Sequence, residues 1–107
     1  MKLTLLITFF LTLSVTLAFA AGDAKAGKAV YDKSCKACHG ATGAANPNIA
    51  KMMKVDMRDL SSSDVQSMSD SDMKQIITEG KGKMKPIKSV AGKDLDHVIA
   101  YVRSLKK

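Results

Sequence analysis

Residues 34–40 read Ser-Cys-Lys-Ala-Cys-His-Gly and carry the side chains best suited to covalent or metal chemistry. Cys35 and Cys38 are the two cysteines of the chain, and His39 directly follows the second. On a helical turn these three residues stand at positions i, i+3 and i+4, so their side chains project from one face. Two thiols and an imidazole arranged in this way could form a disulfide, bind zinc or carry a haem.

The rest of the sequence discriminates among these alternatives. A Cys35–Cys38 disulfide would close a very short loop and remove little entropy from the unfolded chain. A structural zinc ion needs four ligands, usually with a second ligand pair, and only His97 remains as a nitrogen ligand. A thioredoxin-like redox motif would require a strand–helix pattern around the cysteines, which is not seen. Because CxxCH is the attachment signature of c-type haem, we favour haem.

Residues 1–20 have the layout of a secretory signal peptide. Lys2 supplies a positive charge, an apolar stretch follows at 3–17, and Ala18-Phe19-Ala20 has the small residues of a cleavage site. A membrane anchor is the alternative, because an apolar run of this length could span a bilayer as a helix. We expect cleavage, which would release a domain of residues 21–107 into the periplasm without stable membrane insertion.

The predicted mature domain is poor in large side chains. All three Phe lie within residues 1–20, and the chain has no Trp, so only Tyr31 and Tyr101 remain as aromatic residues. A domain of this size buries a modest share of its surface and usually recruits a disulfide, a metal or another group. We therefore expect a bound group to supply part of the interior.

Capping residues and apolar periodicity predict a helical chain with one domain and no strands. Asp23 and Ser69 are suitable N-caps, Gly80 is a suitable helix end, and the last segment repeats apolar residues at three and four. Residues 49–60 show no clean periodicity and are expected to form a turn of helix or an irregular wall. The predicted helices are 23–35, 69–80 and 94–107, with a short turn at 64–68 and loops at 40–48 and 80–86.

A haem iron has a sixth coordination position, which electron carriers fill with Met or His. Met84 is the favoured ligand because it is the one apolar residue in a loop of lysines and glycines, 80–86. Its neighbouring glycines would let the backbone approach a porphyrin closely, and Pro86 would stiffen the loop. The other candidates are Met52, Met53 and Met57. Met68 and Met73 are better explained as flexible core fillers, and His97 as a surface or satisfied helix residue.

These features resemble the small bacterial monohaem class I cytochromes c over essentially all of residues 21–107. The matching positions are Gly27 and Tyr31, the segment 35–39, Pro47-Asn48-Ile49, the Met84 loop, and Ala100-Tyr101-Val102. The resemblance implies an all-α, cytochrome c-like fold, a small helical bundle wrapped around one covalently attached haem. In that fold the first and last helices would cross at Gly27 and pack Tyr31 against Val98 and Tyr101.

The resemblance also assigns site residues. It implies that Pro47 and Ile49 belong to the haem-binding set, with the Pro47 carbonyl accepting the imidazole N–H of His39 and setting its tautomer. Family members commonly have Met followed at once by Pro, whereas Lys85 separates Met84 from Pro86 in this chain.

The implied function is one-electron transfer by a periplasmic carrier that is not an enzyme. Its cofactor would be one haem c with iron, attached through Cys35 and Cys38 and ligated by His39 and Met84. With both axial positions filled, the supported chemistry is exchange between Fe(III) and Fe(II). The alternative is a haem enzyme or a gas or ligand sensor, whose sixth iron position is open or labile.

The charge pattern bears on the partners. The chain has a formal net charge of +7, and its lysines flank both predicted ligand segments at positions 36, 81, 83, 85 and 88. Such a ring could steer a monomeric carrier to acidic docking patches on redox partner proteins. The alternative is an ordinary solvated basic face. Nucleic acid is not expected as a partner, because there is no aromatic platform for bases.

Overall fold

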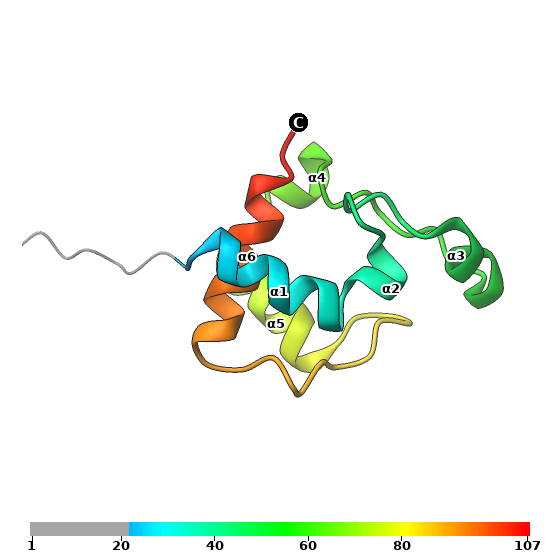
Figure 1. Cartoon of the computed structure of the whole chain (residues 1–107). Coiled ribbons are helices and arrows are strands. Elements are labelled where there is room, and N and C mark those ends of the chain that lie inside the picture. Colours follow the sequence, from blue (N-terminus) through cyan, green and yellow to red (C-terminus); the bar gives the residue numbers. More distant parts are fainter. Residues whose placement is uncertain (1–21) are drawn as a thin grey trace, which may run out of the picture.

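The computed structural model describes residues 22–107, in which six helices are joined by turns and loops (Figure 1). The predicted signal peptide at 1–20 lies outside the described residues. Within residues 22–107 no strand is formed, and a single isolated antiparallel bridge joins Lys81 to Met84. The all-α prediction is therefore confirmed. In the same part of the chain, no helix is both long and apolar enough to cross a membrane.

The first and last helices form the framework of the fold. α1 (Ala24–Ser34) begins after Asp23, whose carboxylate accepts a hydrogen bond from the Lys25 amide at 2.9 Å. α6 (Lys93–Ser104) makes with α1 the most extensive contact among the described helices. As Figure 1 shows, the two helices pack together beside the point where the described chain begins.

Gly27 permits the close approach of α1 and α6. A Cβ at this position would collide with the His97 carbonyl oxygen and would lie 2.9 Å from Cβ of Tyr101. The rings of Tyr31 and Tyr101 pack nearby, with centroids 4.9 Å apart. The predicted helix crossing at a glycine, with a tyrosine pair beside it, is confirmed.

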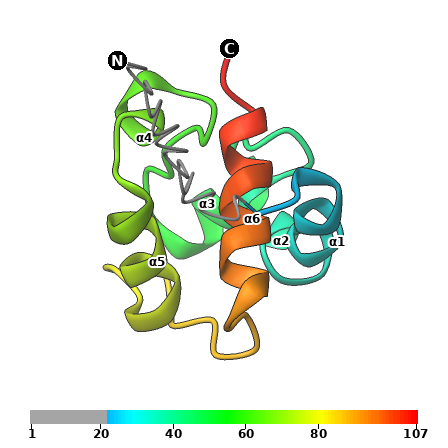
Figure 2. The ribbon, with the colours of Figure 1, turned by 90° about the vertical axis from the view of Figure 1, so that its left-hand side faces the viewer.

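The remaining long helix, α5 (Asp70–Glu79), is capped as its sequence predicts. The Ser69 hydroxyl accepts a hydrogen bond from the Asp72 amide at 3.0 Å, and Gly80 ends the helix at a φ of 79°. Figure 2 shows α6 between α1 on one side and α4 and α5 on the other. Ion pairs of 2.7 Å, Lys74–Asp96 and Arg103–Asp70, join α5 to α6.

Two shorter helices complete the outer part of the fold. α4 (Ser63–Gln66) corresponds to the predicted short turn, and the Gln66 amide fastens it to α6 by donating to the Val102 carbonyl at 2.9 Å. α3 (Pro47–Met53) was predicted only in part, because residues 40–48 were expected to be loop and residues 49–60 a turn of helix or an irregular wall. The Asn46 side chain caps α3, and Pro47 occupies its first turn, where a fixed φ and a missing N–H are tolerated.

The core is small. Among the described residues, the buried hydrophobic side chains come mainly from α1, α4, α5 and α6, and they are Tyr31, Val65, Met73, Val90, Val98 and Ile99. The partly buried side chains that pack on them include Cys35 and Met68. The core therefore reaches the cysteine motif directly.

Candidate functional site

The cysteine motif forms a helical turn directly after α1. Cys35 is the C-cap of α1, and α2 (Lys36–His39) begins at the next residue. The amides of Cys38 and His39 both donate to the Cys35 carbonyl, at 3.2 and 3.0 Å. This is the helical backbone that the spacing predicts, and both cysteines are free thiols.

Two adjoining pockets lie beside this turn. Their volumes are about 440 Å³ and about 310 Å³, and most of their lining is apolar. The residues that line both pockets are Cys35, His39, Asp56, Lys81 and Met84. Cys38 lines the larger pocket but not the smaller one. These volumes lie within the range typical of ligand and cofactor sites.

The two thiols differ in environment. Cys38 is exposed, whereas Cys35 is half-buried. Burial raises the pKa of the Cys35 thiol to about 11, with a further contribution from the neighbouring Cys38. Cys35 is therefore a neutral thiol over the physiological pH range, and it forms part of the apolar wall.

His39 contributes a polar group that the surrounding chain does not satisfy. Its Nδ1 atom is buried and has no hydrogen-bond partner. Burial also lowers the pKa of the imidazole, which favours the neutral form that binds metals. Because an unpaired buried polar atom is costly, His39 suits a site where a bound group engages the imidazole.

The hydrogen bond expected from His39 to the Pro47 carbonyl is not formed in this structure. Pro47 is exposed at the start of α3, Ile49 is half-buried two residues further on, and neither lines the two pockets. Asn46 instead joins this segment to the cysteine motif. Its backbone amide donates to the Cys38 carbonyl at 2.9 Å, and its side-chain amide donates to the Ala37 carbonyl at 3.2 Å.

Met84 lies in a tight backbone turn. The Lys81 amide donates to the Met84 carbonyl at 2.9 Å, and the Met84 amide returns a hydrogen bond of 3.0 Å to the Lys81 carbonyl. Gly80 and Gly82 adopt positive φ values of 79° and 56° on either side of Lys81. A Cβ at Gly80 would lie 2.6 Å from the Met84 carbonyl oxygen, so glycine is required there for the turn to close.

The methionines that are candidate iron ligands differ in which of the two pockets they line. Met53 and Met57 line the larger pocket only, and Met52 is 72% exposed and lines neither. Met68 and Met73 line the smaller pocket from the core side, which confirms their interpretation as fillers. Met84 is the one methionine among the described residues that lines both pockets.

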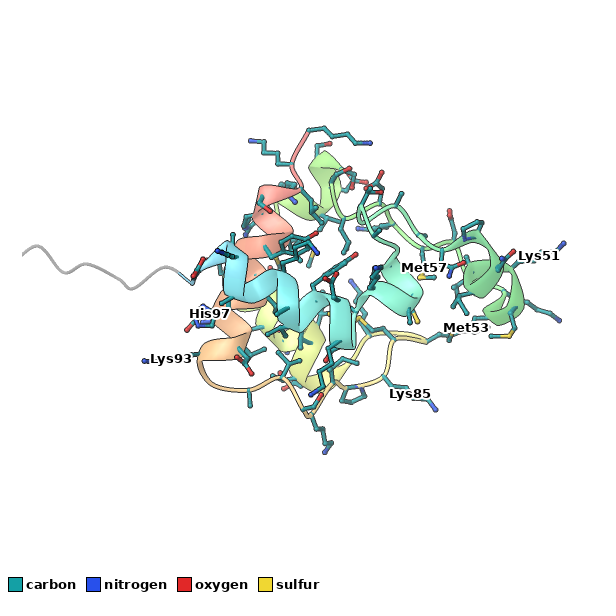
Figure 3. All side chains as sticks on the ribbon, viewed as in Figure 1. Lys51, Met53, Met57, Lys85, Lys93 and His97 are labelled. Atoms are coloured by element: carbon teal, nitrogen blue, oxygen red, sulfur yellow. The ribbon has the colours of Figure 1, made fainter. Side chains whose placement is uncertain are left out.

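Figure 3 shows Met57 near α2, whereas His97 lies on the distant side of the molecule on α6. The His97 Nδ1 atom accepts a hydrogen bond from the Asp23 amide at 2.8 Å. His97 is therefore a satisfied helix residue, as predicted.

Several lining residues were not identified from the sequence. Ile87 is flanked by Pro86 and Lys88 and could have been identified in the same way as Met84, whereas Val55 lies among the methionines of residues 52–57 and does not stand out. The charged residues Asp56 and Arg58 line the pockets with no local signal, because only the tertiary structure brings them there. Of the five predicted ring lysines, the three at positions 81, 83 and 85 line the larger pocket.

Comparison with known proteins identifies the family. Residues 22–102 match the family described as "Cytochrome C oxidase, cbb3-type, subunit III". The chain belongs to this cytochrome c family. A solved structure, "KustC0563 c-type cytochrome", matches with a TM-score of 0.65 and 26% identity, covering 76% of this chain and 98% of that one. A comparison with curated proteins finds no significant match.

As a cytochrome c, the protein is an electron-transfer haem protein with covalently bound haem c and its iron. The residues beside α2 fit such a cofactor. Free thiols and a buried imidazole without a partner meet at largely apolar pockets, which provides attachment groups, a metal ligand and an apolar lining in one place. This small cytochrome c also has the helical fold expected of a monohaem protein.

Proposed function

We propose that this cytochrome c is a periplasmic one-electron carrier with His39 and Met84 as axial ligands of its haem iron. The observation that carries the proposal is that Met84 lines both pockets together with Cys35 and His39. When bound, the haem supplies an Fe(III)/Fe(II) couple that accepts and donates single electrons.

The chain's own residues have distinct roles in this proposal. The thiols of Cys35 and Cys38 would hold the haem through thioether bonds to its two vinyl groups, which would keep the cofactor attached outside the cytoplasm. Neutral His39 would supply one nitrogen ligand to the iron, and the Met84 thioether would supply a second protein ligand. The apolar lining limits the access of water to the iron.

Met84 is preferred to the other methionines for two reasons. Its turn is fixed by two backbone hydrogen bonds, so the thioether is presented from a defined backbone. Met53 and Met57 line only the larger pocket, and Met52 is largely exposed. Two protein ligands leave no open coordination position, which favours electron exchange over catalysis or gas binding.

The proposal includes the setting of the carrier. After cleavage of residues 1–20 the mature protein would act in the periplasm as a monomer that moves between redox partners. Exposed Lys81, Lys83 and Lys85 at the larger pocket would face acidic docking patches on those partners. N-terminal sequencing of the protein from the periplasmic fraction tests the export step, and a start at Met1 would contradict it.

An absorption spectrum of the oxidised holoprotein tests the axial ligation. We expect a methionine-to-iron charge-transfer band that is lost in Met84→Ala and retained in the matched control Met57→Ala. Loss of the band in Met57→Ala alone would move the ligand to Met57. High-spin features and rapid CO binding in the unsubstituted protein would instead indicate an open or labile position, and with it a haem enzyme or sensor.

A further inference from the structure

Lys83 connects the two walls of the larger pocket. Its Nζ atom donates a hydrogen bond to the Met53 carbonyl, 30 residues away in the chain. Lys83 belongs to the Met84 turn and Met53 is the last residue of α3, and both residues line the larger pocket. One side chain therefore crosses from the Met84 turn to the segment that follows the cysteine motif.

The acceptor is a carbonyl that its own helix leaves available. α3 ends with Lys54 in the left-handed region at a φ of 54°. The amides of Lys54 and Val55 bond back to the carbonyls of Ala50 and Lys51. The last carbonyls of a helix carry partial negative charge, which favours a lysine ammonium group.

α3 has little else to hold it in place. Among the described helices, α3 makes no extensive contact with another helix, and Figure 1 shows it at the edge of the molecule, far from α6. Its first turn is joined to the cysteine motif through Asn46. The Lys83 hydrogen bond thus joins the far end of α3 to the rest of the protein.

The Met84 turn transmits this connection to the methionine. Two backbone hydrogen bonds between Lys81 and Met84 enclose Lys83, so a displacement of Lys83 displaces Met84 with it. Lys85 offers a contrast within the same loop. It also lines the larger pocket, but Figure 3 shows its side chain directed away from the molecule.

We propose that Lys83 is a positioning residue that anchors the Met84 turn to the end of α3 and slows replacement of Met84 on the haem iron by external ligands. The inference rests on the His39 and Met84 ligation proposed above. It assigns to Lys83 a role that its charge alone would not give, since Lys81 and Lys85 carry the same charge at the same pocket.

The test measures how fast imidazole displaces methionine in the oxidised holoprotein, followed by loss of the methionine charge-transfer band. Neutral imidazole is the probe, so that removing a lysine charge does not alter its attraction to the protein. We expect Lys83→Met to accelerate the displacement about two- to tenfold, as befits one exposed hydrogen bond. Lys85→Met, the control with the same loss of charge, should react like the unsubstituted protein, and Lys83→Arg should restore most of the slow rate.

Two outcomes overturn the inference in distinguishable ways. Equal rates in Lys83→Met and Lys85→Met, with the methionine band present in all the proteins, would refute the role of Lys83 and leave the ligation intact. Absence of the band from the unsubstituted protein would refute both proposals.

Discussion

Tyr31 joins the core to the cysteine motif through one hydroxyl group. The side chain is fully buried, and its hydroxyl donates to the Gly40 carbonyl at 2.6 Å, one residue past His39. Burial raises the pKa of Tyr31 to about 12 from its ordinary value of 10.0. The hydroxyl therefore remains a donor throughout the physiological pH range and fixes the end of α2.

Tyr31→Phe should lower the free energy of unfolding of the holoprotein by about 1–2 kcal/mol, because the Gly40 carbonyl loses a buried donor. Denaturant titration measures the change. Tyr101→Phe is the matched control, since it also loses one hydroxyl from the tilted tyrosine pair. An unchanged stability in Tyr31→Phe would show that the hydrogen bond does not stabilise the turn.

The effect of Tyr31→Phe on the free energy of unfolding should also depend on pH. Between pH 10 and about 12 the unfolded chain releases the Tyr31 proton while the folded protein keeps it, so rising pH favours unfolding in that window. Tyr31→Phe has no phenol to titrate at this position. The difference in the free energy of unfolding between the unsubstituted protein and Tyr31→Phe should therefore become smaller as the pH rises.

The crossing of helices α1 and α6 depends on Gly27. Gly27→Ala adds a methyl group that collides with the His97 carbonyl, and it should destabilise the protein by about 1–3 kcal/mol despite the better helix propensity of alanine. Thermal unfolding measures this. Lys33→Ala on the exposed side of α1 is the control, and its effect should stay within about 0.5 kcal/mol. A stabilised Gly27→Ala protein would mean that the two helices can separate at no cost.

The elements that could be predicted from the sequence are those with local signals. Asp23, Ser69 and Gly80 act as caps as their types suggest, and apolar periodicity identified α6. The start of α3 was missed because Asn46-Pro47, a cap followed by a first-turn proline, lies within a segment rich in Gly, Ala and Asn that is equally typical of a loop. The cap signal was present, but the surrounding composition outweighed it.

In the candidate site too, the residues with a local sequence signal were predictable and the others were not. The spacing of Cys35, Cys38 and His39 is local, so their shared helical turn was predictable. Asp56 and Arg58 line the pockets only because the chain returns there after α3, and no pattern around them indicates it. The expected His39–Pro47 hydrogen bond came from resemblance alone, and α3 arranges that segment differently.

Exposed lysines, among them Lys81 and Lys85, line the larger pocket on one side of the molecule. Figure 3 places Lys93 on the opposite side of the molecule from Lys85. If the pocket side is the docking face, a charge change should matter there and not at Lys93.

The double variant Lys81→Glu/Lys85→Glu should slow reduction of the holoprotein by the anionic reagent ferrocyanide about two- to tenfold at low salt. Lys25→Glu/Lys93→Glu makes the same change in net charge and should have a smaller effect, because screening weakens attraction over distance. Stopped-flow rates at several ionic strengths measure both. Equal slowing by the two double variants would mean that total charge, not a local face, governs the encounter.

The packing of α1 against α6 also has a consequence for the order of folding. Residues that support the cysteine motif come from the two ends of the described chain, and α6 is its last helix. During synthesis the motif emerges well before α6, the helix that packs against α1. Cofactor attachment can therefore begin on a segment that has not yet acquired its tertiary neighbours, and the arrival of α6 would close the structure around a group already joined to it.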